Sequence, residues 1–383
     1  MSTKKKSSPE FDSIVCCLQG GGALGAYQVG VLQALHEADY CPEWFVGTSI
    51  GAINAGICAG NRPKERIDRL QEFWYRVASS NPLDVLPVPD DVALNRTLNY
   101  WAAQRALLEG QAGFFQPRFP PPHLSWHDDP KLLSYYDTAP LKKTLEELID
   151  FDWLNSGKIR LSVGAVEITS GEMVYFDTKH MRIEAEHIMA SGALPPGFPA
   201  VEVNGKLYWD GGISSNTPVS HVLEDRTAKE RLCFMVHLFD SYGLKPQTLD
   251  DVLKRKKDIE FSSRFERLLE LHKANHKLRY QINQMAQLLP EKKCDQPIIK
   301  ECISSGWDHR VALVRFLHKG EDAELSSKDY EFSRRSIDNH IAEGYDAAQL
   351  AVKKSVWKKP IPEAEGIALY DMAKEFLEDG TLS

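Results

Sequence analysis

The residues Gly47-Thr48-Ser49-Ile50-Gly51 form a G-x-S-x-G pentapeptide between a short apolar run and a stretch of small residues. In this pattern the serine lies on a tight strand-to-helix turn, where a Cβ atom at either flanking glycine would clash. The hydroxyl then lies at a helix N-terminus, where backbone N–H groups favour developing negative charge. We therefore interpret Ser49 as a candidate nucleophile, with Gly47 and Gly51 as supports of its turn.

A second glycine-rich stretch, GGGALG at residues 20–25, follows an earlier apolar run and also satisfies G-x-G-x-x-G, a dinucleotide-binding pattern. In a dinucleotide fold the second strand ends in an acidic residue that binds the ribose, whereas here the second strand ends in Ser49. No cofactor is therefore predicted. The loop is interpreted instead as a source of N–H donors for an oxyanion, each worth about 10²–10³ in rate. The predicted donors are Gly20, Gly21, Gly22 and Ile50.

A nucleophilic serine needs a proton acceptor, and the strongest candidate is Asp210. It ends a short strand and is followed by Gly211 and Gly212, a turn that leaves its carboxylate uncovered. A Ser-His-Asp triad stays open at this point, because His221 and His237 follow Asp210 in the order expected of such a triad.

Two histidine pairs have the i, i+4 spacing of metal ligands, His123 with His127 and His272 with His276. The first pair lies among prolines and the second on a basic helical pattern. Neither belongs to a set of the H-E-x-x-H type. No metal site is predicted.

The elements that must position these residues alternate between strand and helix. Strands are expected at 14–18, 44–47, 159–167, 173–176, 232–239 and 310–317. Helices are expected at 24–38, 50–60, 64–78, 184–191, 249–289, 330–353 and 363–377. This alternation predicts an α/β fold with a parallel sheet covered by helices on both faces.

The chain is predicted to divide into a disordered tail at 1–10, a catalytic α/β domain at 11–240 and a mostly helical C-terminal extension at 241–383. Residues 80–137 are rich in proline and aromatic residues, too irregular for sheet and too apolar for a free linker. We interpret them as an ordered cap or lid insertion, with simple packing against the domain as the alternative.

Taken together, these motifs resemble those of the patatin-like lipid acyl hydrolases. The resemblance covers the 20–25 loop, the 47–52 elbow, the segment ASGALPPGFP at 190–199 and the Asp210-Gly211-Gly212 turn, in that order. It implies a three-layer α/β/α fold with a mainly parallel sheet and a Ser49–Asp210 dyad without histidine. Many members carry Lys or Arg where this chain has Leu24, which argues against a strong preference for anionic phospholipid.

The charge and composition of the chain indicate which kinds of partner to expect. The 383 residues carry a net charge of −8, which argues against nucleic acid as the main partner. No apolar h-region or membrane-length apolar run occurs, and the seven cysteines show no C-x-x-C spacing, so a cytoplasmic protein is expected. Residues 245–293 hold 12 Lys and Arg against 7 Asp and Glu. The basic helix at 249–289 is a predicted contact with the inner membrane or a lipid droplet, and a solvated helix packed on the core is the alternative.

The function expected from these residues is a serine lipid acyl hydrolase of the phospholipase A, lysophospholipase or carboxylesterase type, working through an acyl-enzyme. The alternative is a lipid-binding or regulatory module on the same fold. Head group, acyl length and oligomeric state are left open.

Overall fold

The computed structural model describes residues 11–79, 91–122, 129–262, 265–290, 295–306, 309–320, 323–359 and 361–373. The predicted tail at 1–10 lies outside the described residues. So do 80–90 and 123–128 of the predicted cap, including the pair His123 and His127.

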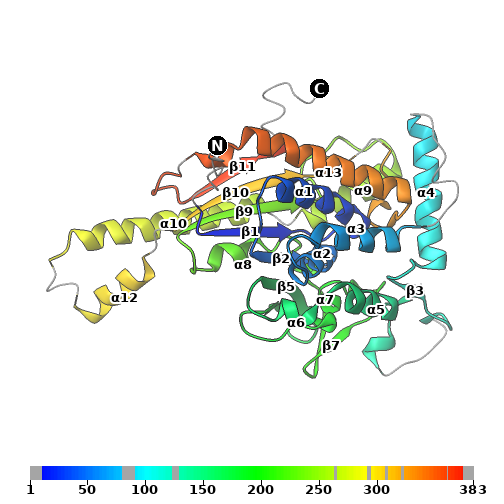
Figure 1. Ribbon diagram of the computed structural model, residues 1–383, viewed down its shortest axis with the longest axis horizontal. Helices are drawn as coiled ribbons and strands as arrows, with labels where there is room; N and C mark the ends of the chain where they lie inside the picture. The colour runs from blue at the N-terminus through cyan, green and yellow to red at the C-terminus, as the bar shows by residue number, and fades with distance from the viewer. Residues whose placement is uncertain are drawn as a thin grey trace, which may run out of the picture.

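A single large sheet forms the centre of the molecule, and within the described residues it has nine strands (Figure 1). Their order is β11-β10-β9-β1-β2-β5-β8-β7, with β6 pairing with β5 off this path. The pairs from β11 to β5 are parallel, whereas β6, β7 and β8 are joined by antiparallel pairs. The strands are β1 Ser13–Leu18, β2 Trp44–Thr48, β5 Arg160–Glu167, β6 Met173–Asp177, β7 Val201–Val203, β8 Lys206–Asp210, β9 Glu230–His237, β10 Arg310–Leu317 and β11 Ile367–Asp371.

Helices cover both faces of this sheet. The described helices are α1 Ala26–Glu37, α2 Ile50–Ala59, α3 Arg66–Val77, α4 Val92–Glu109, α5 Ala139–Leu148, α6 Phe151–Leu154, α7 Ala185–Ser191, α8 Val219–Glu224, α9 Leu249–Phe261, α10 Phe265–Gln287, α12 Pro297–Ser305 and α13 Arg334–Lys354. Successive strand residues face opposite sides. Cys16 therefore joins the core under α1, α2, α3 and α13, whereas Cys17 joins the core under α8 and α10. The predicted α/β fold with a mainly parallel sheet is confirmed.

Three secondary-structure expectations were wrong. The segment 363–377 was predicted as a helix, but 367–371 form strand β11, because its apolar residues pair with β10 at the sheet edge. The single helix expected at 249–289 is two helices, α9 and α10, which end and begin at Phe261 and Phe265. The stretch 80–137 was considered irregular, yet it contains the 18-residue helix α4, whose N-cap Asp91 accepts a hydrogen bond from the Leu94 amide.

The segment after residue 240 is built into the sheet rather than appended to it. Strands β10 and β11 extend the parallel sheet beyond β9, and α13 lies along α1. The two helices approach so closely that a Cβ on Gly30 would lie 1.9 Å from the Ile341 carbonyl oxygen, and one on Gly344 would lie 2.1 Å from the Tyr27 carbonyl oxygen. Glycine at both positions permits this contact between backbones.

Two helical features lie at opposite ends of the long axis of the molecule (Figure 1). Helices α10 and α12 extend from one end, and α4 stands along the other. Among the described helices, none is long and apolar enough to cross a lipid bilayer.

Candidate active site

Ser49 lies between β2 and α2 in a backbone conformation that few L-residues adopt, with φ 57° and ψ −127°. Such a conformation costs about 1–3 kcal/mol and persists only where its surroundings hold it. Here the Ser49 amide donates to both the carbonyl and the side-chain oxygen of Ser191, at 3.1 and 3.0 Å. The Ser191 hydroxyl in turn donates to the Gly164 carbonyl at 2.6 Å. Ser191 therefore holds the strained turn.

The glycines on either side of Ser49 leave no room for a side chain. A Cβ on Gly47 would lie 2.3 Å from the Gly51 carbonyl oxygen, and one on Gly51 would lie 2.3 Å from the Leu18 carbonyl oxygen. Real Cβ atoms do not approach backbone oxygens this closely. The G-x-S-x-G pattern is therefore a steric requirement of the turn.

Asp210 reaches Ser49 from β8, the antiparallel neighbour of β5. The Ser49 side chain lies beside its carboxylate and favours the ionised form, and the Gly212 amide donates a hydrogen bond to it at 2.7 Å. Asp210 is 1 % exposed. Burial raises the pKa of its carboxyl to about 7, although Ser49 and the Gly212 amide act in the opposite direction. Gly211 lets the turn pass close to β5, because a Cβ there would lie 2.4 Å from the Gly164 carbonyl oxygen.

The glycine loop after β1 lies against the serine. A Cβ on Gly20 would be 2.8 Å from the Ser49 Cβ. The Gly20 amide, one of the four predicted oxyanion donors, instead donates to the Asn216 carbonyl at 3.3 Å, and the Asn216 side chain donates back to the Gly20 carbonyl at 3.1 Å. Among the described residues, no backbone acceptor is found for the amides of Gly21, Gly22 and Ile50. These three amides are therefore the donors with free capacity beside Ser49.

Position 24, which the family resemblance singled out as a site of positive charge in many members, faces inward. Leu24 is fully buried in the main core and does not line the cavity beside Ser49. A cation at this position would therefore be buried in apolar surroundings here, which explains why leucine suits this chain.

A cavity of about 300 Å³ opens beside these residues. Among the predicted residues, Gly20, Gly21, Gly22, Ser49, Ile50, Asp210 and Gly212 line it. The remaining wall is largely aromatic and is formed by Phe114, Phe115, Tyr136, Phe198, Phe239, Phe261, Tyr330 and Phe332. A polar pair at one side of an apolar cavity is the arrangement needed to hold an ester whose chain is hydrophobic.

The wall includes residues that sequence reasoning missed. Phe261 ends α9, and its carbonyl accepts hydrogen bonds from the side chains of Gln19 and Asn216, at 3.1 and 3.0 Å. Tyr330 and Phe332 come from the segment before α13, and the neighbouring Asp329 bonds Lys257 of α9 at 2.6 Å. No local pattern marks these residues, because only the docking of the C-terminal segment brings them to the serine.

The two histidines that left a triad open lie elsewhere. His221 contacts Asp177 at 3.3 Å and stacks on Tyr175, with ring centroids 4.1 Å apart. His237 is buried against Phe265, and this burial, with Arg315 nearby, lowers its pKa to about 3. Among the described residues that line the Ser49 cavity there is no histidine. The geometry therefore brings together a serine and an aspartate only.

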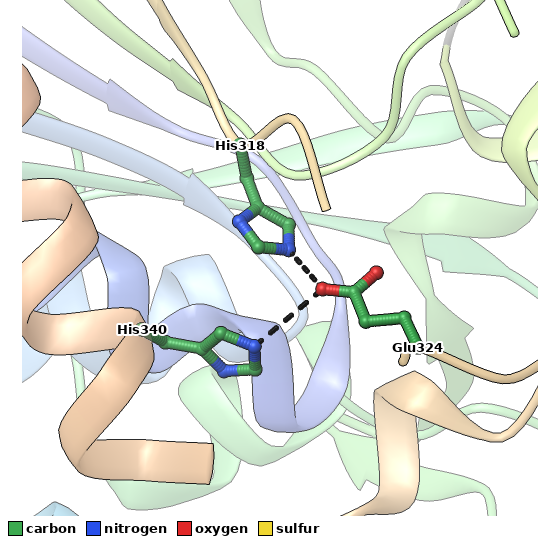
Figure 2. Close-up of side chains that lie close together, drawn as sticks. All are labelled: His318, Glu324 and His340. Carbon is green, nitrogen blue, oxygen red and sulfur yellow. Dashed lines mark hydrogen bonds and ion pairs between the residues drawn. The ribbon is translucent and has the colours of Figure 1, made fainter. Parts of the chain in front are cut away.

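Three buried side chains elsewhere have the composition of a metal site: His318, Glu324 and His340 (Figure 2). A Glu324 carboxylate oxygen lies 2.6 Å from His318 Nε2 and 3.6 Å from His340 Nε2. The other ring nitrogen of His318 lies 2.7 Å from a Glu343 oxygen.

These contacts link the group into a network of charged side chains. Burial alone would lower the pKa of His318, but the Glu324 and Glu343 carboxylates outweigh it and raise the pKa to about 10. Both ring nitrogens of the protonated His318 then donate to carboxylates. Lys328 adds a positive charge 3.5 Å from Glu324 and bonds Asp258 of α9 at 2.9 Å. The network therefore secures the segment that carries the cavity residues Asp329, Tyr330 and Phe332. His272 and His276 contact Ser220 and the Glu363 carbonyl instead of a metal-binding group.

Comparison with known proteins gives two family matches. A family model described as patatin-like phospholipase matches residues 16–223, more than half of the chain, and a second, described as patatin phospholipase, matches 259–364. A patatin-like phospholipase domain-containing protein of Pyricularia oryzae is 36 % identical over 66 residues, 17 % of this chain and 8 % of that relative. The chain thus spans less than a tenth of that relative's length.

Among solved structures, VipD from Legionella pneumophila is similar over 91 % of this chain and 68 % of its own, with 17 % identity and a TM-score of 0.40. The ExoU–SpcU complex of Pseudomonas aeruginosa matches over 78 % of this chain and 66 % of that chain, with 17 % identity and a TM-score of 0.29. The family match includes the glycine loop, the Ser49 elbow and the Asp210 turn. The chain belongs to the patatin-like phospholipase family.

Proposed function

We propose that this protein is a serine lipid acyl hydrolase that uses Ser49 as nucleophile and Asp210 as general base. The observation that carries the proposal is the placement of the Ser49 side chain beside the buried Asp210 carboxylate, both on the wall of an aromatic cavity of about 300 Å³. The family match to patatin-like phospholipases supports the same class of reaction.

The reaction proceeds in two steps. The ionised Asp210 accepts the Ser49 proton as the serine oxygen attacks the ester carbonyl, and the amides of Gly21, Gly22 and Ile50 stabilise the oxyanion. Collapse of this intermediate expels the alcohol, which takes the proton from Asp210, and leaves an acyl-serine. Water then attacks the acyl-serine and gives a proton to Asp210. Asp210 returns this proton to the Ser49 oxygen as the C–O bond breaks and the fatty acid leaves. Gly20 acts by bringing the loop close to the serine.

The aromatic wall of the cavity supports a substrate that carries an acyl chain. Its aromatic wall can bury an acyl chain, and each buried methylene contributes about 0.8 kcal/mol. Phospholipids, lysophospholipids, acylglycerols and shorter esters all carry such a chain, so the cavity selects for the acyl part rather than for a head group.

The experiment is hydrolysis of these four substrate classes by the purified protein and by Ser49→Ala and His221→Gln. We expect at least one class to be hydrolysed, Ser49→Ala to lose at least about 10³ in kcat/KM, and His221→Gln to stay near the wild type. Folding of each variant is checked by thermal denaturation. If the folded protein binds lipid but releases no fatty acid from any class, the hydrolase proposal fails in favour of a lipid-binding module.

A further inference from the structure

Helix α4 has an unusual distribution of side chains, because its apolar residues face outward. Leu94, Leu98, Trp101 and Leu108 lie on one face of the helix, because with Arg105 they recur at alternating spacings of four and three. On that face Leu94 is 40 %, Trp101 62 % and Leu108 76 % exposed, Leu98 is half-buried, and the charged Arg105 pairs with Glu109.

The opposite face of α4 holds the helix to the body through small and polar residues. Ala103 and Ala106 are buried there. The Asn99 side chain donates to the Ala323 carbonyl at 3.3 Å, and Arg335 of α13 donates to the side-chain oxygens of Asn95 and Asn99 at 3.0 and 3.2 Å. A helix that only packed on the core would bury its leucines and tryptophan and expose its asparagines. The outward apolar face therefore has another partner.

We infer that the exposed face of α4, which we call the α4 stripe (Leu94, Leu98, Trp101 and Leu108), is the surface by which this protein docks on lipid. The inference rests on the proposed function for the nature of its substrate. Its location supports it, because Leu107, next to Leu108, lines the Ser49 cavity, and its carbonyl accepts a hydrogen bond from Tyr136 in the same wall at 2.8 Å. A lipid surface touching the stripe lies beside the cavity that would receive its acyl chain.

The chemistry and dimensions of the stripe favour lipid over a second copy of the chain. Trp101 packs edge-on against Tyr100, and such amphipathic rings are preferred at the boundary between headgroups and acyl chains. A helix of 18 residues is about 27 Å long and about 10 Å wide, too narrow a ridge to supply the ~800 Å² per partner of a stable dimer. Single side chains can insert into a lipid surface without such an area.

The stripe also differs from the predicted contact at 249–289. In α9 the basic side chains bind the body, for example Lys254 to the Glu324 carbonyl at 3.2 Å and Lys257 to Asp329. Helix α10 extends from the end of the molecule opposite α4 (Figure 1). A membrane bound to α10 would lie at the other end from the cavity wall formed by Leu107.

The test compares two matched double variants in sedimentation with vesicles of phosphatidylcholine, alone and with added phosphatidylglycerol. Trp101→Gln with Leu108→Gln alters the stripe, and Leu278→Gln with Met285→Gln makes the same kind of change on exposed residues of α10. We expect the stripe variant to lose at least about tenfold in vesicle partitioning and the α10 variant to bind as the wild type does. Unchanged turnover of a water-soluble short-chain ester by the stripe variant shows that its site is intact.

A second measurement uses vesicles whose acyl chains are brominated. Quenching of tryptophan fluorescence should fall in Trp101→Leu, which keeps the apolar surface and therefore the binding. The inference is overturned if the stripe variant binds vesicles as well as the wild type, or if the stripe variant is monomeric where the wild type is dimeric and neither binds vesicles. If vesicle binding depends on the α4 stripe but no ester is hydrolysed, the docking surface is supported and only the proposed hydrolase function is contradicted.

Discussion

Ser49 and Asp210 carry the proposed chemistry, and each lies in surroundings that are energetically unfavourable for its active form. Ser49 is held in a strained conformation by Ser191, and Asp210 is buried where ionisation is unfavourable. A carboxylate with a pKa near neutrality is a stronger base than an exposed aspartate, and it still ionises at the pH of the cell. The protein thus spends stability at this pair to obtain a reactive serine.

The pH dependence of turnover follows from Asp210. Because the base must be ionised and its pKa lies at about 7, kcat/KM for an uncharged ester should rise with a slope of one through about pH 7 and level off above it. A pH profile on a water-soluble ester measures this. Ionisation of a histidine could produce a similar rise of kcat/KM with pH. The control is therefore His221→Gln, in which this rise should be unchanged. Loss of the rise in that variant would assign the ionisation to His221 and contradict the Ser49–Asp210 dyad.

Asp210 should also reduce stability above neutral pH. Its pKa in the folded protein, about 7, exceeds its ordinary value of 3.8, so folding takes up a proton between these pH values and stability falls as pH rises through them. Asp210→Asn cannot ionise. We expect it to be inactive and, at pH 8, more stable than the wild type by about 4 kcal/mol at most, with the difference vanishing near pH 4. Urea denaturation of both proteins at pH 4 and pH 8 tests this. The prediction is contradicted if the free energy of unfolding of Asp210→Asn, relative to that of the wild type, is lower at pH 8 than at pH 4.

At the scale of elements, the contact between α1 and α13 joins the two parts of the chain. Gly344→Ala should destabilise the protein, since its Cβ would lie 2.1 Å from the Tyr27 carbonyl oxygen and force the helices apart. We expect a loss of about 1–3 kcal/mol in urea denaturation, although helix propensity alone would favour alanine by about 1 kcal/mol. Asp346→Ala, on the exposed face of the same helix, is the control and should change stability little. A stabilised Gly344→Ala would show that the helices are not in backbone contact.

The elements also show which parts of the site could be predicted. Ser49 and its glycines follow a local rule, because a strand-to-helix turn this tight excludes side chains at both flanks. Asp210 followed a weaker local signal, a glycine turn after a strand, and its role needed the family resemblance. The occupied amide of Gly20 could not be predicted, because its acceptor is the Asn216 carbonyl, about two hundred residues away in the chain.

At the scale of the whole molecule, the alternating pattern predicted the parallel half of the sheet well, because buried parallel strands are continuous apolar runs. It failed at β11, whose five residues are short enough to be mistaken for part of a helix. It failed again at α4, where the apolar face points outward and the prolines on either side obscured the helix. The strands, α13 and cavity residues after residue 240 make the C-terminal segment part of the same globule as the dyad.

That the whole folded chain activates Ser49 is the central claim, and covalent labelling tests it most directly. A fluorophosphonate reacts with a serine only where a base and oxyanion donors activate it. We predict a single adduct on the 383-residue chain, located at Ser49 by peptide mass spectrometry, absent in Ser49→Ala and formed much more slowly in Asp210→Asn. A folded wild-type protein that does not react, or a Ser49→Ala variant that is labelled equally, would contradict it.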